Sequence, residues 1–237
     1  MQNLVELERC QTFVNYQLQP ANRATPEKPA GLPRAVTISR QAGCGAAIVA
    51  GKLTKLLQQH SPQDSCPWTI FDRNLMAKVL EDHHLPARIA KFLPEDRRTE
   101  LQDITDELFG LRPTSWTVVE QTAETILHLA ELGNVIIIGR GANVITARLP
   151  DVFHVRLVAP LEKRIEHAHE FYEMTKKEAR EFCLREDLGR VRYLKKYFKA
   201  DINDPLLYHL TINTGLVSYD EAARLIVEAA TAKPVLI

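Results

Sequence analysis

The sequence predicts an α/β fold in which helices cover both faces of a five-stranded parallel sheet. Short β-branched or apolar segments alternate along the chain with longer segments of helical periodicity. One apolar segment, residues 135–138, reads Val-Ile-Ile-Ile without interruption. Such a run is typical of a strand buried on both faces of a parallel sheet. Strands that alternate with helices pair in parallel through helical crossovers.

The expected strands and helices follow one another in a regular order. Residues 84–132 should be mostly helical, and Thr175 and Glu178 have the spacing of a capping box for the helix that follows. We expect strands over 35–39, 68–71, 135–138, 152–158 and 207–213, and helices over 46–59, 74–83, 115–132, 161–169, 176–198 and 219–230.

A short helix and a proline-rich linker precede this body. Residues 3–18 have an apolar face that includes Phe13, and four prolines follow between positions 20 and 33. We therefore expect residues 1–34 to be an appendage and residues 35–237 to be one domain. The appendage can pack on the body, form a homodimer contact or remain free, and its apolar face favours the first two.

Composition and charge exclude several classes of protein. The 237 residues are 45% hydrophobic, and 30 Lys and Arg balance 30 Asp and Glu. A net charge of zero argues against a dedicated nucleic-acid-binding protein. No apolar run approaches the roughly 18 residues of a membrane helix, and residues 1–11, with Glu6 and Glu8 and no long apolar stretch, are not expected to be a secretory signal. Four cysteines and eight histidines show no metal-binding spacing. We expect a cytoplasmic protein without a membrane or nucleic-acid partner and without metal-ligating side chains.

Glycine, arginine and aspartate residues follow three of the expected strands. The carboxyl ends of parallel strands meet at one edge of the sheet, where ligands bind by default. Arginine at such an edge suits phosphate, because its planar fork binds two oxygens at once. Residues 40–45 follow the first strand, Asp72 and Arg73 follow the second, and residues 139–141 follow the third.

The first of these turns has features of a phosphate-binding loop. Glycines let consecutive backbone amides converge on an anion, and the positive end of the next helix points there. The strict pattern G-x-x-x-x-G-K-[ST] is broken, because Arg40 replaces its first glycine while Ala46 and Ala47 take the lysine and hydroxyl positions. By itself the loop is equally typical of a tight turn. Its position at a helix N-terminus predicts a lowered pKa for the Cys44 thiol.

Taken together, these segments resemble the bacterial cytidylate kinase-like family, which is related to the nucleoside monophosphate kinases. The family's loop typically reads Ser-Arg-x-x-Gly-Ser-Gly-Gly-Arg and also lacks the lysine. The resemblance implies a three-layer P-loop kinase fold with a helical lid, and it covers roughly residues 35–230. It rests on residues 37–45, 71–73, 135–143, 155–160 and 212–214, and on Arg164, Asp187, Arg190, Tyr193 and Tyr197.

The resemblance also implies an activity and a set of site residues. The activity is phosphoryl transfer from ATP to a nucleoside monophosphate, with CMP or dCMP as the best candidates and Mg²⁺ held mainly by the phosphates. The catalytic arginines would be Arg140 on the acceptor phosphate and Arg164 and Arg190 in the lid. Donor-binding residues would be Arg40, Gln41, Ala42, Gly43, Cys44, Gly45, Ala46 and Ala47, and substrate-binding residues would be Asp72, Arg73, Gly139, Arg140 and Asp187.

The chain departs from the family pattern at the loop. Ala46 and Ala47 supply no cation to the donor phosphates. Our hypothesis is that Arg40 and Arg140 carry the charge that the loop lacks. Two alternatives stay open: a non-catalytic regulatory protein that binds nucleotide, and a kinase of another small metabolite, since one fold hosts several acceptors.

Overall fold

The computed structural model describes residues 12, 13, 16, 31–62, 65–72, 104 and 117–232, and a five-stranded parallel sheet lies at its centre. The strands lie side by side in the order β2-β3-β1-β4-β5, which confirms the predicted fold class. Because β1 lies between strands that come later in the chain, its carboxyl end opens at the switch point of the sheet. The strands are β1 (Ala35–Arg40), β2 (Thr69–Phe71), β3 (Val135–Ile138), β4 (Val152–Val158) and β5 (Leu210–Asn213).

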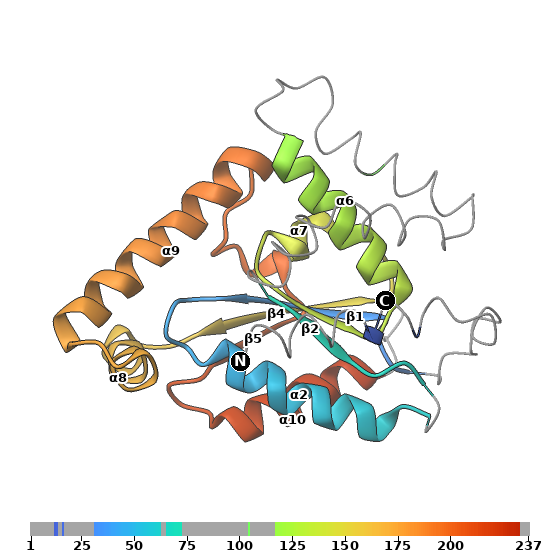
Figure 1. Cartoon of the computed structure of the whole chain (residues 1–237), viewed down its shortest axis with the longest axis horizontal. Coiled ribbons are helices and arrows are strands. Elements are labelled where there is room, and N and C mark those ends of the chain that lie inside the picture. Colours follow the sequence, from blue (N-terminus) through green and yellow to red (C-terminus); the bar gives the residue numbers. More distant parts are fainter. Residues whose placement is uncertain are drawn as a thin grey trace.

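Helices cover both faces of this sheet, with α2 and α10 on one side and α6 on the other (Figure 1). The last strand is shorter than predicted, because Pro205–Leu207 form a 3₁₀ turn capped by the Asp204 side chain. The helix expected over residues 74–83 lies outside the described residues. The described helices are α2 (Ala46–His60), α6 (Thr117–Leu132), α7 (Ala142–Ile145), α8 (Leu161–Tyr172), α9 (Lys176–Phe198) and α10 (Tyr219–Thr231).

Alternation along β1 and β3 divides the core between the two faces. Ile38 and Ile136 belong to the core under α2 and α10, whereas Val135 and Ile137 belong to the core under α6 and α7. Side chains alternate across a strand, so a strand covered on both faces needs apolar residues at every position. Burying each of these large side chains stabilises the fold by about 1.5–3 kcal/mol.

Two described residues of the N-terminal appendage, Phe13 and Leu32, belong to this core. Phe13 is helical and fully buried, and its ring lies 5.6 Å from that of Phe71, edge to face. This contact agrees with packing on the body, one of the three roles expected for the appendage. Its other predicted role, a homodimer contact, stays a prediction.

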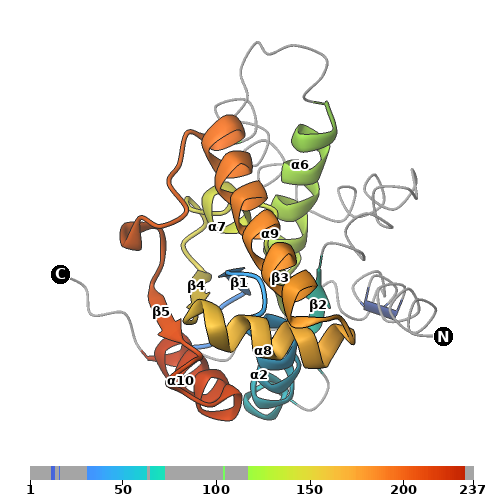
Figure 2. The same ribbon diagram turned by 90° about the vertical axis from the view of Figure 1, so that its left-hand side faces the viewer.

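The α8 and α9 helices cross the carboxyl edge of the sheet (Figure 2). The predicted capping box is confirmed at the start of α9, where the Thr175 side chain accepts from the Glu178 amide and the Glu178 carboxylate accepts from the Thr175 amide. Ala168, Ala179 and Cys183 pack with Ala42 in a small apolar cluster, which seats both helices on the loop after β1. Among the described helices, none combines the length and apolarity required to cross a membrane.

The buried histidines predict how stability depends on pH. Burial lowers the pKa of His128 and of His154 from 6.5 to about 4, and His209 adds to the effect at His154. The unfolded chain then binds more protons than the folded one between about pH 6.5 and pH 4. Each histidine should therefore cost about 1 kcal/mol of unfolding free energy per pH unit as the pH falls through this range.

Urea unfolding at a series of pH values measures this slope. We expect His154→Asn to make the slope shallower. The matched control is Thr37→Val, which removes the hydroxyl 2.8 Å from His154 Nδ1 but keeps the titrating ring. That variant should be less stable at every pH with the slope unchanged, and an identical slope in His154→Asn would contradict the assignment.

Candidate functional site

The loop between β1 and α2 has the backbone of an anion-binding turn. Gly43 and Gly45 have φ angles of 78° and 74°, in the left-handed region that favours glycine. A Cβ at Gly43 would lie 2.3 Å from the Arg164 carbonyl oxygen, and one at Gly45 would lie 2.4 Å from the Tyr219 ring. Both positions therefore require glycine for conformation and for space.

Two cavities lie at the carboxyl edge of the sheet. The loop cavity, of about 170 Å³, is lined by residues 40–48 together with Asp72, Phe171, Phe182 and Arg190 among others. The β3 cavity, of about 260 Å³, is lined by the turn after β3 and by one side of α9. Three residues line both cavities, namely Arg40, Ile138 and Arg190, so the two spaces meet at a pair of arginines.

The Arg40 side chain passes over the turn that follows β3. Its Nη1 lies 1.7 Å from the place that a Cβ of residue 139 would occupy, so any other residue there would displace the Arg40 guanidinium and strain a backbone with a φ of 82°. Burial and the nearby Arg190 lower the pKa of Arg40 from 12.5 to about 10. The guanidinium remains protonated at neutral pH, and an anion between the two arginines would offset their repulsion.

The turn after β3 is wound in the left-handed region. Gly139, Arg140 and Gly141 have φ angles of 82°, 56° and 73°. A residue with a side chain costs about 1–2 kcal/mol in this conformation, and such strain is concentrated at functional sites. Arg140 and Asn143 line the β3 cavity, and the buried Arg140 Nε and Asn143 Nδ2 have no hydrogen-bond partner in the described part of the chain. Arg140 in the turn and Asn143 in α7 thus each have a buried donor without a partner in the described part of the chain, and both residues line the same cavity.

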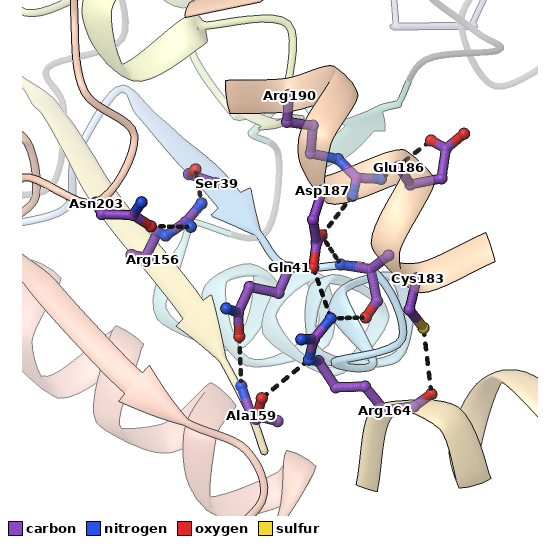
Figure 3. Close-up of polar contacts among 11 residues, drawn as sticks. Ser39, Gln41, Arg156, Ala159, Arg164, Cys183, Glu186, Asp187, Arg190 and Asn203 are labelled. Carbon is purple, nitrogen blue, oxygen red and sulfur yellow. Dashed lines mark hydrogen bonds and ion pairs between the residues drawn. The ribbon is translucent and has the colours of Figure 1, made fainter. Parts of the chain in front are cut away.

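An ion pair ties α8 and α9 to the loop (Figure 3). The Asp187 carboxylate accepts from the Ala42 amide at 2.7 Å and from Arg164 Nη1 at 2.6 Å. Arg190 Nη1 donates to the same carboxylate at 3.1 Å. Arg164 also donates to the carbonyls of Ala42 and Ala159, at 3.1 and 2.9 Å, and its side chain is 7% exposed. The carboxylate therefore neutralises a buried arginine and fixes the loop backbone.

A second arginine lies beneath the β3 cavity. Arg156 is 5% exposed, and its Nη1 donates to Ser39 Oγ at 2.8 Å while its Nη2 donates to Asn203 Oδ1 at 3.3 Å (Figure 3). The Tyr208 ring lies under its guanidinium at 5.8 Å. Since Ser39 lines the cavity, Arg156 adds positive potential to its floor.

The structure places most of the predicted site residues around the two cavities. Residues 40–47, Asp72 and Arg190 line the loop cavity, and Gly139 and Arg140 line the β3 cavity. Arg164 and Asp187 instead lie behind the loop and contact each other. Arg73 lies outside the described residues. The assignment of these residues to donor or acceptor stays a prediction.

Burial changes the expectation for Cys44. Its thiol is 1% exposed, and burial raises its pKa to about 11, although Arg40 acts in the opposite direction. The prediction of a lowered pKa was wrong because the side chain packs in the core beneath α2. The neutral thiol adds no negative charge to the loop.

Several residues that line the cavities were not among the predicted site residues. Arg185, Gly189 and Tyr193 line the β3 cavity at intervals of four residues along α9. That spacing places them on one helical face, and Tyr193, on which the family resemblance partly rests, could have pointed to the other two. His167, Phe171, Tyr172 and Phe182 form an aromatic wall over the loop cavity, and no signal in the sequence pointed to it.

Comparisons with known proteins agree with this description. The model of the cytidylate kinase-like family matches residues 35–216. An uncharacterized protein from Eubacterium ventriosum ATCC 27560 has the same fold, with a TM-score of 0.65 and 18% identity over 84% of this chain and 98% of that one. A shikimate kinase from Bacteroides thetaiotaomicron gives a TM-score of 0.40 and 13% identity, over 83% of this chain and 93% of that one.

A curated relative matches only in part. The uronate isomerase of Corynebacterium glutamicum is 27% identical over 116 residues, which is 49% of this chain. The chain spans only 22% of the length of that protein. The match carries no conclusion about activity.

Replacing Asp187 tests whether its ion pair holds the loop. Asp187→Asn should lower the free energy of unfolding by on the order of 2 kcal/mol, because it leaves the Arg164 charge buried without its counterion. The matched control is Glu162→Gln, whose partner Arg180 lies 3.6 Å away with both side chains more than half exposed. That change should have little effect on urea unfolding. Equal stability of the two variants would contradict the assigned role.

Proposed function

The chain belongs to the cytidylate kinase-like family, whose match supports kinase-like phosphoryl transfer, and we propose that it phosphorylates a nucleoside monophosphate with ATP. CMP or dCMP is the proposed acceptor. The observation that carries the proposal is the meeting of two cavities at Arg40 and Arg190, one of them floored by a glycine-containing loop. Phosphoryl transfer needs two anionic substrates in line and positive charge between them.

The two cavities suggest a division of the substrates. The loop cavity would take the donor phosphates, because its lining loop leads into the N-terminus of α2 and needs glycine at two positions. The β3 cavity would take the acceptor, with Arg140 on its phosphate. Arg40 and Arg190 would then neutralise the phosphoryl group as it passes between them.

Arg40 would replace the lysine that Ala46 does not supply. It comes from the strand end and still reaches both cavities. Its charge is buried, and a buried charge acts more strongly on a phosphate than one in water does. Bound Mg²⁺ would supply further positive charge, held mainly by the phosphates, and Asp72 contributes a carboxylate to the same cavity. We place this reaction in the cytoplasm, where its nucleotide substrates occur.

The alternative is a protein that binds nucleotide without transferring phosphate. Two features favour it: the loop has alanine at both functional positions, 46 and 47, and aromatic side chains rather than cations cover much of the loop cavity. Losing one cation that stabilises the transition state costs about 10²–10³ in rate, so slow or absent turnover is a real outcome.

A turnover assay separates the two functions. Purified protein with ATP and Mg²⁺ should release ADP when CMP or dCMP is added, and more slowly with UMP, AMP or GMP. The measurement is coupled ADP release, checked by detection of the diphosphate product. ATP binding without turnover on any acceptor would favour the non-catalytic protein, and turnover on another metabolite would change the acceptor.

Replacing Arg40 tests the substitute cation. Arg40→Ala should weaken ATP binding about tenfold and slow transfer by about 10²–10³, whereas Arg40→Lys should recover part of both. The matched control is Lys52→Ala, a cation on α2 whose partner is Asp220 at 2.6 Å and which lines neither cavity. Calorimetric ATP titration and initial rates measure the effects. Unchanged ATP affinity in Arg40→Ala would rule out the role.

A further inference from the structure

A glycine in the middle of α9 has no neighbour that explains it. Gly189 lies well inside a helix of 23 residues, where glycine is less favourable than any residue except proline. Helical glycines are usually needed where another backbone or side chain comes close. Here a Cβ at residue 189 would meet no heavy atom within 4 Å among the described residues.

The open space beside Gly189 belongs to the β3 cavity. Arg185, Gly189 and Tyr193 line it at four-residue intervals, so they follow one another along one face of α9. Glu186 and Arg190 line the same cavity on either side of this row. Gly189 is exposed, so a side chain there would project from the lining of the cavity without packing against the described part of the protein.

The turn after β3 supplies an independent sign of a ligand. Asn143 is 5% exposed and lines the same cavity. Its Nδ2 is buried and has no hydrogen-bond partner within the described ranges. A buried amide donor without a partner costs about 1–3 kcal/mol, so a ligand that accepts from it would recover that free energy.

From these observations we infer that the base of the acceptor lies flat against the backbone of α9 at Gly189. The Tyr193 ring flanks the base, and Asn143 Nδ2 donates to a carbonyl oxygen or ring nitrogen on its edge. Glycine is needed because a planar group can approach a helix backbone closely only where there is no Cβ. The inference rests on the proposed function, since it places the base of the nucleoside monophosphate that the β3 cavity would hold.

The chain offers a matched pair of glycine variants. Gly51 lies inside α2, its Cβ would also meet nothing within 4 Å, and it lines neither cavity. Because alanine is the better helix former, Gly189→Ala and Gly51→Ala should each raise the melting temperature of the full chain by about 2 °C. A structural need for either glycine would instead lower it.

Binding then separates the two variants. Calorimetric titration of wild type and both variants with CMP and with ribose 5-phosphate should show CMP bound at least about tenfold more weakly by Gly189→Ala alone. Ribose 5-phosphate has no base and should bind all three proteins alike. Asn143→Leu should likewise weaken CMP and leave ribose 5-phosphate unchanged.

Each other outcome overturns a stated claim. Equal CMP affinity in wild type and Gly189→Ala overturns the inference but leaves the proposed function intact if the wild type phosphorylates CMP. Equal weakening for CMP and ribose 5-phosphate places the contact at the sugar or phosphate and overturns the position of the base. A wild type that binds none of the common nucleoside monophosphates overturns the proposed function and the inference together.

Discussion

The site depends on the passage of the Arg40 side chain over Gly139. The two residues come from neighbouring strands in register, because β1 pairs with β3 and Ile38 lies opposite Ile138. The arginine and the glycine therefore constrain each other, since any side chain at 139 would occupy the position of the guanidinium. This one crossing puts a cation between the two cavities, beside the turn from which Arg140 lines the second. A local change at either strand end would alter both halves of the site.

The Asp187 carboxylate couples the α8–α9 pair to the same place. One of its oxygens accepts from the Ala42 amide and from Arg190, and the other accepts from Arg164. Moving α9 away would leave a buried arginine without its counterion, so loop and helices should move as one unit. Arg190 is the exception, because it also lines both cavities and has a second carboxylate nearby in Glu186, at 3.4 Å. An incoming phosphate would compete for Arg190 without breaking the pair beneath it.

Much of the fold could be predicted because alternation and periodicity are local signals. Residues 135–138 were readable as a strand from four apolar residues in a row, and α9 was predicted over 176–198 from its capping box and composition. The start of the last strand was harder to predict from the sequence, because the 3₁₀ turn that begins at Pro205 depends on capping by the Asp204 side chain. The short α7 was missed because it contains one turn, too few residues for a period to show.

The position of candidate site residues could be predicted from the sequence only where glycine or a charged residue directly follows a strand. Arg40 and Arg140 follow strands directly, so topology alone brings them to one edge. The roles of Arg164 and Asp187 depend on how far α8 and α9 tilt over that edge, which no spacing along the chain determines. For the same reason nothing in the sequence distinguishes Gly189, and only the structure shows that it lines the β3 cavity.

A loop without lysine can still be part of a phosphate-binding site if another residue supplies the positive charge from a position where the effective dielectric constant is lower. A loop lysine would stand at the start of α2, whereas Arg40 lies at the strand end beneath the junction of the cavities. There, burial lowers its pKa only to about 10, so it keeps its charge in surroundings less polar than bulk water. The aromatic wall over the loop cavity contributes to these surroundings. A site with fewer cations and less water can attract a phosphoryl group as strongly as a more hydrated site with a loop lysine. The reason is that the Coulomb energy rises as the effective dielectric constant falls.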